Sequence, residues 1–133
     1  MIETLKFENG EIYSMIIRSD YSIKNNINFI TNEDDDFQLG FMHRSKGYNI
    51  EPHYHLKNNR SITTCSEVLL IKSGKIKVNF YDTSLTKIDD KILMKGDTII
   101  FLKGGHGFEF IEDSEVIEVK QGPYNGVNDK KRF

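Results

Sequence analysis

Apolar and polar residues alternate with a period of two along much of the chain. In residues 67–72, Glu67, Leu69 and Ile71 share one face, and residues 75–82 alternate in the same way. Successive side chains of a strand point to opposite sides, so both segments are predicted strands with one apolar face. The Ser-Gly turn between them predicts a hairpin.

The same alternation, with turn residues between its runs, predicts strands along the whole chain. Asn9-Gly10 predicts a hairpin turn within residues 4–18, and no segment shows a convincing helical period. The runs recur about every eight to twelve residues, which is typical of an all-β sandwich or barrel. The other predicted elements are one or two strands within residues 23–30, an acidic turn at 33–36, a strand at 37–42, a polar loop at 57–64, two short strands joined at Asp89-Asp90 within 85–94, and further strands at 98–102, 106–110 and 116–119.

Length and composition are those of one globular domain. The chain has 133 residues, which is enough for a single core, and its formal net charge of −2 disfavours nucleic-acid binding. Its aliphatic runs are too short to cross a bilayer, and no apolar leader is present. Cys65 is the only cysteine, so no internal disulfide can form. We therefore expect a soluble cytoplasmic protein.

Two histidines stand two residues apart ahead of the best-patterned strand. If His53 and His55 lie on a strand, both imidazoles project from one side. Glu67 shares a face with apolar residues, where an ionised carboxylate needs a partner such as a cation. His106 follows a glycine-rich turn and can add a third imidazole. Three imidazoles and a carboxylate are a recognised ligand set for a divalent metal.

These residues fall into a pattern that resembles the first signature motif of the cupin family. The family motif has a glycine, a His-x-His pair, a glutamate and a closing glycine. Gly47, His53, His55, Glu67 and Gly74 match it. The gap between the second histidine and the glutamate is longer here than in the family.

A later stretch is similar to the second cupin motif. Gly96 and Gly104 match its glycines, and His106 matches its histidine one residue early. Leu102 replaces a proline of the family motif, and Ile111 stands where the family has an asparagine.

The resemblance implies a single-domain cupin-type β-barrel, that is, a double-stranded β-helix or jelly roll. The motif-bearing barrel would span about residues 38–121, with N-terminal strands in 1–37 and a C-terminal arm in 122–133. An ordinary β-sandwich with scattered histidines is the alternative. The resemblance also implies one divalent metal, held by His53, His55, Glu67 and His106.

Such a ligand set leaves coordination positions open and suits Fe, Mn, Ni or Zn. Open positions allow Lewis-acid chemistry on a chelating substrate or, with iron, O₂ chemistry. The chain looks like small cupins that act on sugars, sugar phosphates or nucleotide sugars, which implies a metal-dependent isomerase or epimerase. The alternatives are a non-catalytic small-molecule-binding or sensing cupin and an Fe-dependent dioxygenase.

Other residues are candidates for supporting roles. The candidate catalytic acids or bases are His43, Glu109 and Tyr124. Glu51 and Glu109 are alternative carboxylate ligands if the long loop moves Glu67 away from the metal. Candidates for holding a carboxylate or phosphate are Arg44, Arg60, Lys103 and Lys120, and candidates for an apolar lining are Leu69, Phe80 and Phe108. We also expect a homodimer, because small cupins usually pair and the edges of the N-terminal hairpin need covering.

Overall fold

The computed structural model describes all 133 residues and contains ten strands. Its one helical element is a short 3-10 turn near the C-terminus, and no helix has the length and apolar character needed to cross a membrane. The elements in chain order are β1 (Ile2–Lys6), β2 (Ile12–Ile17), β3 (Asn26–Phe29), β4 (Gly40–His43), β5 (Glu67–Ser73), β6 (Lys75–Tyr81), β7 (Lys87–Met94), β8 (Thr98–Phe101), β9 (Gly105–Phe110), β10 (Glu115–Lys120) and η1 (Gly126–Asn128).

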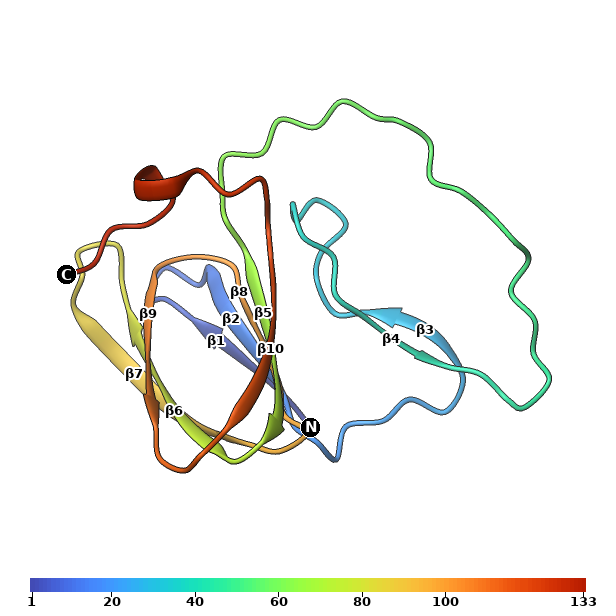
Figure 1. Cartoon of the computed structure of the whole chain (residues 1–133), viewed down its shortest axis with the longest axis horizontal. Coiled ribbons are helices and arrows are strands. Elements are labelled where there is room, and N and C mark those ends of the chain that lie inside the picture. The colour runs from blue at the N-terminus through green and yellow to red at the C-terminus, as the bar shows by residue number, and fades with distance from the viewer. The chain divides into compact units, whose positions relative to one another are not determined.

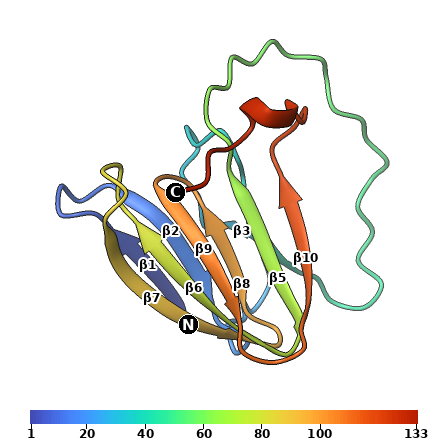
Figure 2. The same ribbon diagram turned by 60° about the vertical axis from the view of Figure 1, so that its left-hand side comes forward.

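The chain forms two compact units. The larger unit comprises residues 1–21 and 64–133, and the smaller unit comprises residues 22–63. The larger unit has one antiparallel sheet in the order β1-β2-β8-β5-β10 and another in the order β7-β6-β9. Figures 1 and 2 show these two sheets as facing layers.

The apolar core of the larger unit lies between its two sheets. The inner faces of β5 and β6 are the apolar faces that the alternation predicts, so that prediction is confirmed. Each fully buried aliphatic or aromatic side chain contributes roughly 2 kcal/mol to folding. The core residues are Leu5, Tyr13, Ile16, Leu69, Ile71, Ile99 and Phe101 from the five-stranded sheet, and Ile76, Val78, Phe80 and Leu93 from the three-stranded sheet.

The predicted N-terminal hairpin is confirmed as β1 and β2. The amide of Phe7 donates to the carbonyl of Glu11 at 2.9 Å and closes the turn. Gly10 has a φ of +87°, whereas Asn9 does not take a positive φ. The register shifts between Leu5 and Lys6, as expected when the turn is followed by a bulge.

The hairpin predicted between β5 and β6 is wrong. β5 pairs with β8 and β10, whereas β6 pairs with β7 and β9, so the two strands belong to different sheets. Gly74 carries the chain from one sheet to the other with a φ of +81°. A Cβ at this position would overlap Oγ of Ser114, in the turn from β9 to β10. Two sheet-to-sheet turns therefore touch, and only glycine fits between them.

β7 is one continuous strand, so the two short strands predicted within residues 85–94 are wrong. Asp89 and Asp90 lie in its middle, and each has a lysine partner: Lys91 at 2.9 Å and Lys87 at 2.7 Å, respectively. β7 is an edge strand, and edge strands commonly carry charged side chains. The acidic pair therefore interrupts the apolar pattern without ending the strand.

The chain turns at Gly96-Asp97, between β7 and β8, and the Asp97 carboxylate holds this turn. This nearly buried side chain accepts hydrogen bonds from Arg18 Nη1 at 2.9 Å, Ser19 N at 2.9 Å and Met94 N at 3.0 Å. The carboxylate thereby connects the ends of β2 and β7 to the beginning of β8. Its role is structural, because each contact is to the protein itself.

The smaller unit has one antiparallel pair of strands, β3 and β4. β4 begins at Gly40, later than the strand predicted from residue 37. The acidic turn predicted at residues 33–36 is confirmed as an exposed turn, in which Asn32 N donates to Asp35 Oδ2 at 2.7 Å.

Residues 44–66 contain no strand. The polar loop predicted at 57–64 is therefore confirmed, but the irregular segment is longer than predicted. His53 and His55 lie within it, so the inference that they project from one face of a strand is wrong. A strand needs a neighbouring strand to pair its backbone groups, and this segment has none.

The fold is all-β and antiparallel, as predicted. None of its three sheets closes into a barrel. The single cupin domain expected over residues 1–133, with its motif-bearing barrel at about 38–121, stays a prediction.

Candidate functional site

Two of the predicted metal ligands meet in the larger unit. Glu67 is the first residue of β5, and His106 is the second residue of β9, on the opposite sheet. His106 Nε2 lies 3.0 Å from Glu67 Oε2. The side chains are 23% and 16% exposed, respectively, so the pair is shielded but reachable from solvent.

Aromatic rings fix the orientation of the His106 imidazole. It stacks on Phe101 with ring centroids 4.1 Å apart and an interplanar angle of 24°. Phe108 lies on the same strand, with its centroid 5.2 Å from the imidazole. Gly105 and Gly107 flank the histidine and add no competing side chain. The ring therefore presents Nε2 to Glu67.

Positive neighbours hold Glu67 in its charged form. The hydrogen bond from His106 is the largest cause that lowers the pKa of this carboxyl, and the charges of His106, Lys120 and Lys130 act in the same direction. Partial burial opposes them but does not outweigh them. Glu67 is therefore a carboxylate at neutral pH, as a metal ligand must be.

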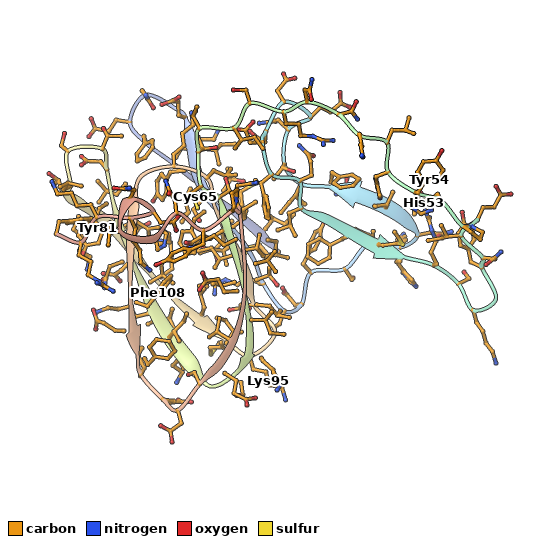
Figure 3. The ribbon with its side chains drawn as sticks, turned by 45° about the horizontal axis from the view of Figure 1, so that its top comes forward. His53, Tyr54, Cys65, Tyr81, Lys95 and Phe108 are labelled. Atoms are coloured by element: carbon orange, nitrogen blue, oxygen red, sulfur yellow. The ribbon has the colours of Figure 1, made fainter.

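The pair lines a pocket of about 540 Å³ at one end of the larger unit. Cys65, Tyr81 and Phe108, labelled in Figure 3, reach it from the segment before β5, from β6 and from β9. The lining residues are Cys65, Glu67, Tyr81, Gly104, Gly105, His106, Gly107, Phe108, Glu118, Asp129, Lys130, Lys131, Arg132 and Phe133. The volume falls within the range of about 300–1,000 Å³ that is usual for small-molecule sites.

Cys65 is not an activated nucleophile in this pocket. Burial and the nearby charge of Glu67 raise the pKa of its thiol. A reactive cysteine needs the opposite shift, towards the thiolate.

His53 and His55, the other two predicted ligands, lie in the smaller unit. Their rings are close together, with centroids 5.5 Å apart, and both side chains are exposed. His53 Nδ1 lies 3.0 Å from the carbonyl oxygen of Glu51. Each unit thus brings together one pair of predicted ligands.

The structure contains no group of three or more His, Cys, Asp or Glu side chains that could hold a metal ion. The four-ligand site of His53, His55, Glu67 and His106 therefore stays a prediction. So do Glu51 and Glu109 as alternative ligands.

The three candidate catalytic residues lie outside the pocket lining. His43, in the smaller unit, is exposed and has Nδ1 2.8 Å from the carbonyl oxygen of Ile23. Glu109 accepts a hydrogen bond from Asn79 and pairs with Lys77, both at 2.9 Å, and these contacts lower its pKa. Tyr124 is exposed. Their catalytic roles stay predictions.

The predicted anion-holding lysines are paired with carboxylates. Lys103 contacts Glu11 at 2.7 Å, and Lys120 contacts Asp129 at 2.8 Å. Neither lysine lines the pocket. The basic side chains that do line it are Lys130, Lys131 and Arg132, which are exposed to solvent.

Sequence reasoning missed several pocket residues. Glu118 had a usable signal, because it stands two residues after Val116 and therefore shares a strand face with this apolar residue. No such sequence signal marks Tyr81 or residues 129–133, since their place in the pocket depends on contacts between distant parts of the chain.

No protein-family model, curated protein or solved structure matches this chain. The resemblance to cupins therefore rests on the motif residues of the sequence alone. The chemistry of the site has to be argued from its own side chains.

Proposed function

We propose that the chain is a cupin-type protein that binds one divalent metal and a small sugar-type molecule, and that it acts as an isomerase or epimerase. The observation that supports this best is the contact between Glu67 and His106 within a pocket of ligand size. In the proposal, Glu67 and His106 are metal ligands, and His53 and His55 are the other two.

The Glu67 and His106 pair fits a metal site. Two donors bound to one ion at about 2.1 Å, at right angles to each other, lie about 3 Å apart. The hydrogen-bonded separation of 3.0 Å is compatible with this value. Nitrogen and carboxylate donors suit Fe, Mn, Ni and Zn. The pair alone is too few ligands, so the proposal needs His53 and His55 as well.

Two free strand edges support the proposal of a cupin-type barrel. β9 pairs only with β6, and β10 pairs only with β5, so each has one edge without a neighbour. Free edges present backbone donors and acceptors that can pair with added strands. In the proposal, further strand pairing at these edges would close the barrel.

A bound metal would polarise a substrate oxygen and acidify the neighbouring C–H group. Proton transfer would then need an acid or base of the protein within the pocket. Tyr81 and Glu118 line the pocket and can donate or accept a proton. The rings of Tyr81 and Phe108 offer apolar surface to a sugar ring.

A second candidate, a non-catalytic binding protein, is favoured by one observation. His43, Glu109 and Tyr124, the acids and bases chosen from the sequence, do not line the pocket. The same metal and ligand would then bind without turnover.

Incubation with candidate substrates separates the two candidates. The protein is loaded in turn with Fe²⁺, Mn²⁺, Ni²⁺ or Zn²⁺ and mixed with hexoses, hexose phosphates and nucleotide sugars. NMR detects the product, because isomerisation leaves the mass unchanged. We expect turnover by the wild-type chain and none by His106→Ala. Retention of a ligand without chemical change, with every metal, would favour the binding protein and count against the enzyme.

A further inference from the structure

Positive charge without a carboxylate partner gathers in the pocket. Lys130, Lys131 and Arg132 all line it, and none of them forms an ion pair in the structure. Of the three carboxylates in the lining, Glu67 contacts His106, Asp129 contacts Lys120, and Glu118 forms no ion pair. The lining therefore carries three cations without an ion-pair partner against one such carboxylate, Glu118.

The three cations stand on a segment that is attached at both ends. On one side, Asp129 forms an ion pair with Lys120 in which the side chains are 10% and 22% exposed, respectively. On the other side, Phe133 meets the ring of Tyr81 edge to face, with centroids 5.1 Å apart and an interplanar angle of 88°.

A glycine makes room for the second attachment. A Cβ at Gly105 would lie 3.0 Å from the ring of Phe133, so a larger residue there would push this ring away. Figures 1 and 2 both show the C-terminal segment crossing the end of the larger unit at which β5 begins and β10 ends. The cations are thus held at the mouth of the pocket rather than on a loose tail.

We propose that residues 129–133 form a phosphate-binding wall of the pocket, in which Lys130, Lys131 and Arg132 bind the phosphate group of a small phosphorylated molecule. This inference extends the proposed function. It rests on that function only in taking the pocket as a ligand-binding site. It narrows the ligand from sugars in general to phosphate esters.

The chemistry of these side chains matches a phosphate dianion. A phosphate group has three terminal oxygens, which can accept from two ammonium groups and from the planar fork of a guanidinium. The nearby rings of Tyr81, Phe108 and Phe133 suit the less polar remainder of the ligand. The pocket is of metabolite size, so we infer a small molecule.

Titration calorimetry on the full chain after treatment with EDTA tests this site separately from the metal. The probes are glucose 6-phosphate, glucose and malonate. The test variant carries Lys130→Gln, Lys131→Gln and Arg132→Gln. The matched control carries Lys24→Gln, Lys46→Gln and Lys95→Gln, which remove the same charge from exposed lysines outside the pocket.

We expect glucose 6-phosphate to bind the wild-type chain and the control variant with affinities within about twofold, and the test variant at least about tenfold more weakly. Glucose should bind none of them measurably. Equal affinity of glucose 6-phosphate for the two variants would overturn the proposal, as would malonate binding as tightly as glucose 6-phosphate. Failure of the metal site would leave these results unchanged, because EDTA removes the metal in every arm.

Discussion

The imidazole of His106 meets the carboxylate of Glu67 across the two sheets of the larger unit, at a distance of 3.0 Å and a sequence separation of 39 positions. The contact joins the second motif of the sequence to the first. It also lies in the pocket that residues 129–133 line from another side. The proposed metal-ligand pair and a basic segment therefore line the same pocket.

Replacement of Gly74 should strongly destabilise the larger unit. Gly74→Ala adds both a side chain at positive φ and an overlap with Ser114, so we expect a loss of about 3 kcal/mol in the free energy of unfolding. Gly10→Ala is the matched control, because Gly10 has a φ of +87° with no atom in the way. It should cost about 1 kcal/mol. If urea unfolding gives the two variants equal losses in the free energy of unfolding, the contact with Ser114 is unimportant.

Asp97→Ala should also destabilise the fold. It leaves Arg18 and the amides of Ser19 and Met94 without their acceptor, and removal of one partner from a nearly buried ion pair costs about 3 kcal/mol or more. Asp90→Ala removes a carboxylate from an exposed pair with Lys87 and should have a much smaller effect. Thermal unfolding of both variants checks this; similar midpoints would contradict the structural role of Asp97.

Tyr13 should make the protein sensitive to alkaline pH. Its ring is buried between Phe7 and Phe80, and burial, followed by the charge of Asp89, raises the pKa of its hydroxyl. A raised pKa in the folded state stabilises the protein below the ordinary value of about 10, and this contribution is lost as the pH rises through the raised pKa. Urea unfolding between neutral and strongly alkaline pH should therefore show less alkaline loss for Tyr13→Phe than for the wild type.

The control for that measurement is Tyr54→Phe, because Tyr54 is 83% exposed. It should follow the wild-type pH profile. If the two variants give the same profile, Tyr13 does not cause the alkaline loss.

The alternation of side chains predicted most of the strands, but it did not predict how they pair. The inner faces of β5 and β6 were read correctly from the sequence, because burial on one face leaves a period of two. The short turn at Gly74 was misread as a hairpin. The positive φ of Gly74 lets the chain cross from one sheet to the other. Glycine is needed there because of the contact with Ser114, a residue far along the chain.

The candidate site could be predicted only in part for the same reason. Glu67 and His106 belong to recognisable motifs, and the structure brings them together. The basic residues of the pocket lie in a segment with no periodic pattern, placed by contacts of Asp129 with Lys120 and of Phe133 with Tyr81. No local signal in the sequence records such contacts.

We expect the chain to form a homodimer. β1 is an edge strand of the five-stranded sheet, and an uncovered edge favours pairing with a second copy. Sedimentation velocity at micromolar concentration should show a dimer. A monomer at micromolar concentration would contradict this prediction.

Metal content after loading with Fe²⁺, Mn²⁺, Ni²⁺ or Zn²⁺ and exhaustive dialysis tests the metal site most directly. The wild-type chain and His43→Ala, which removes a histidine outside the ligand set, should each retain about one ion per chain with at least one of these metals. His106→Ala and the double variant His53→Ala with His55→Ala should retain almost none. Glu67→Gln should weaken binding by about tenfold or more, and an unchanged affinity would leave a site of three histidines. Equal metal content in the wild type and both histidine-ligand variants would contradict the site.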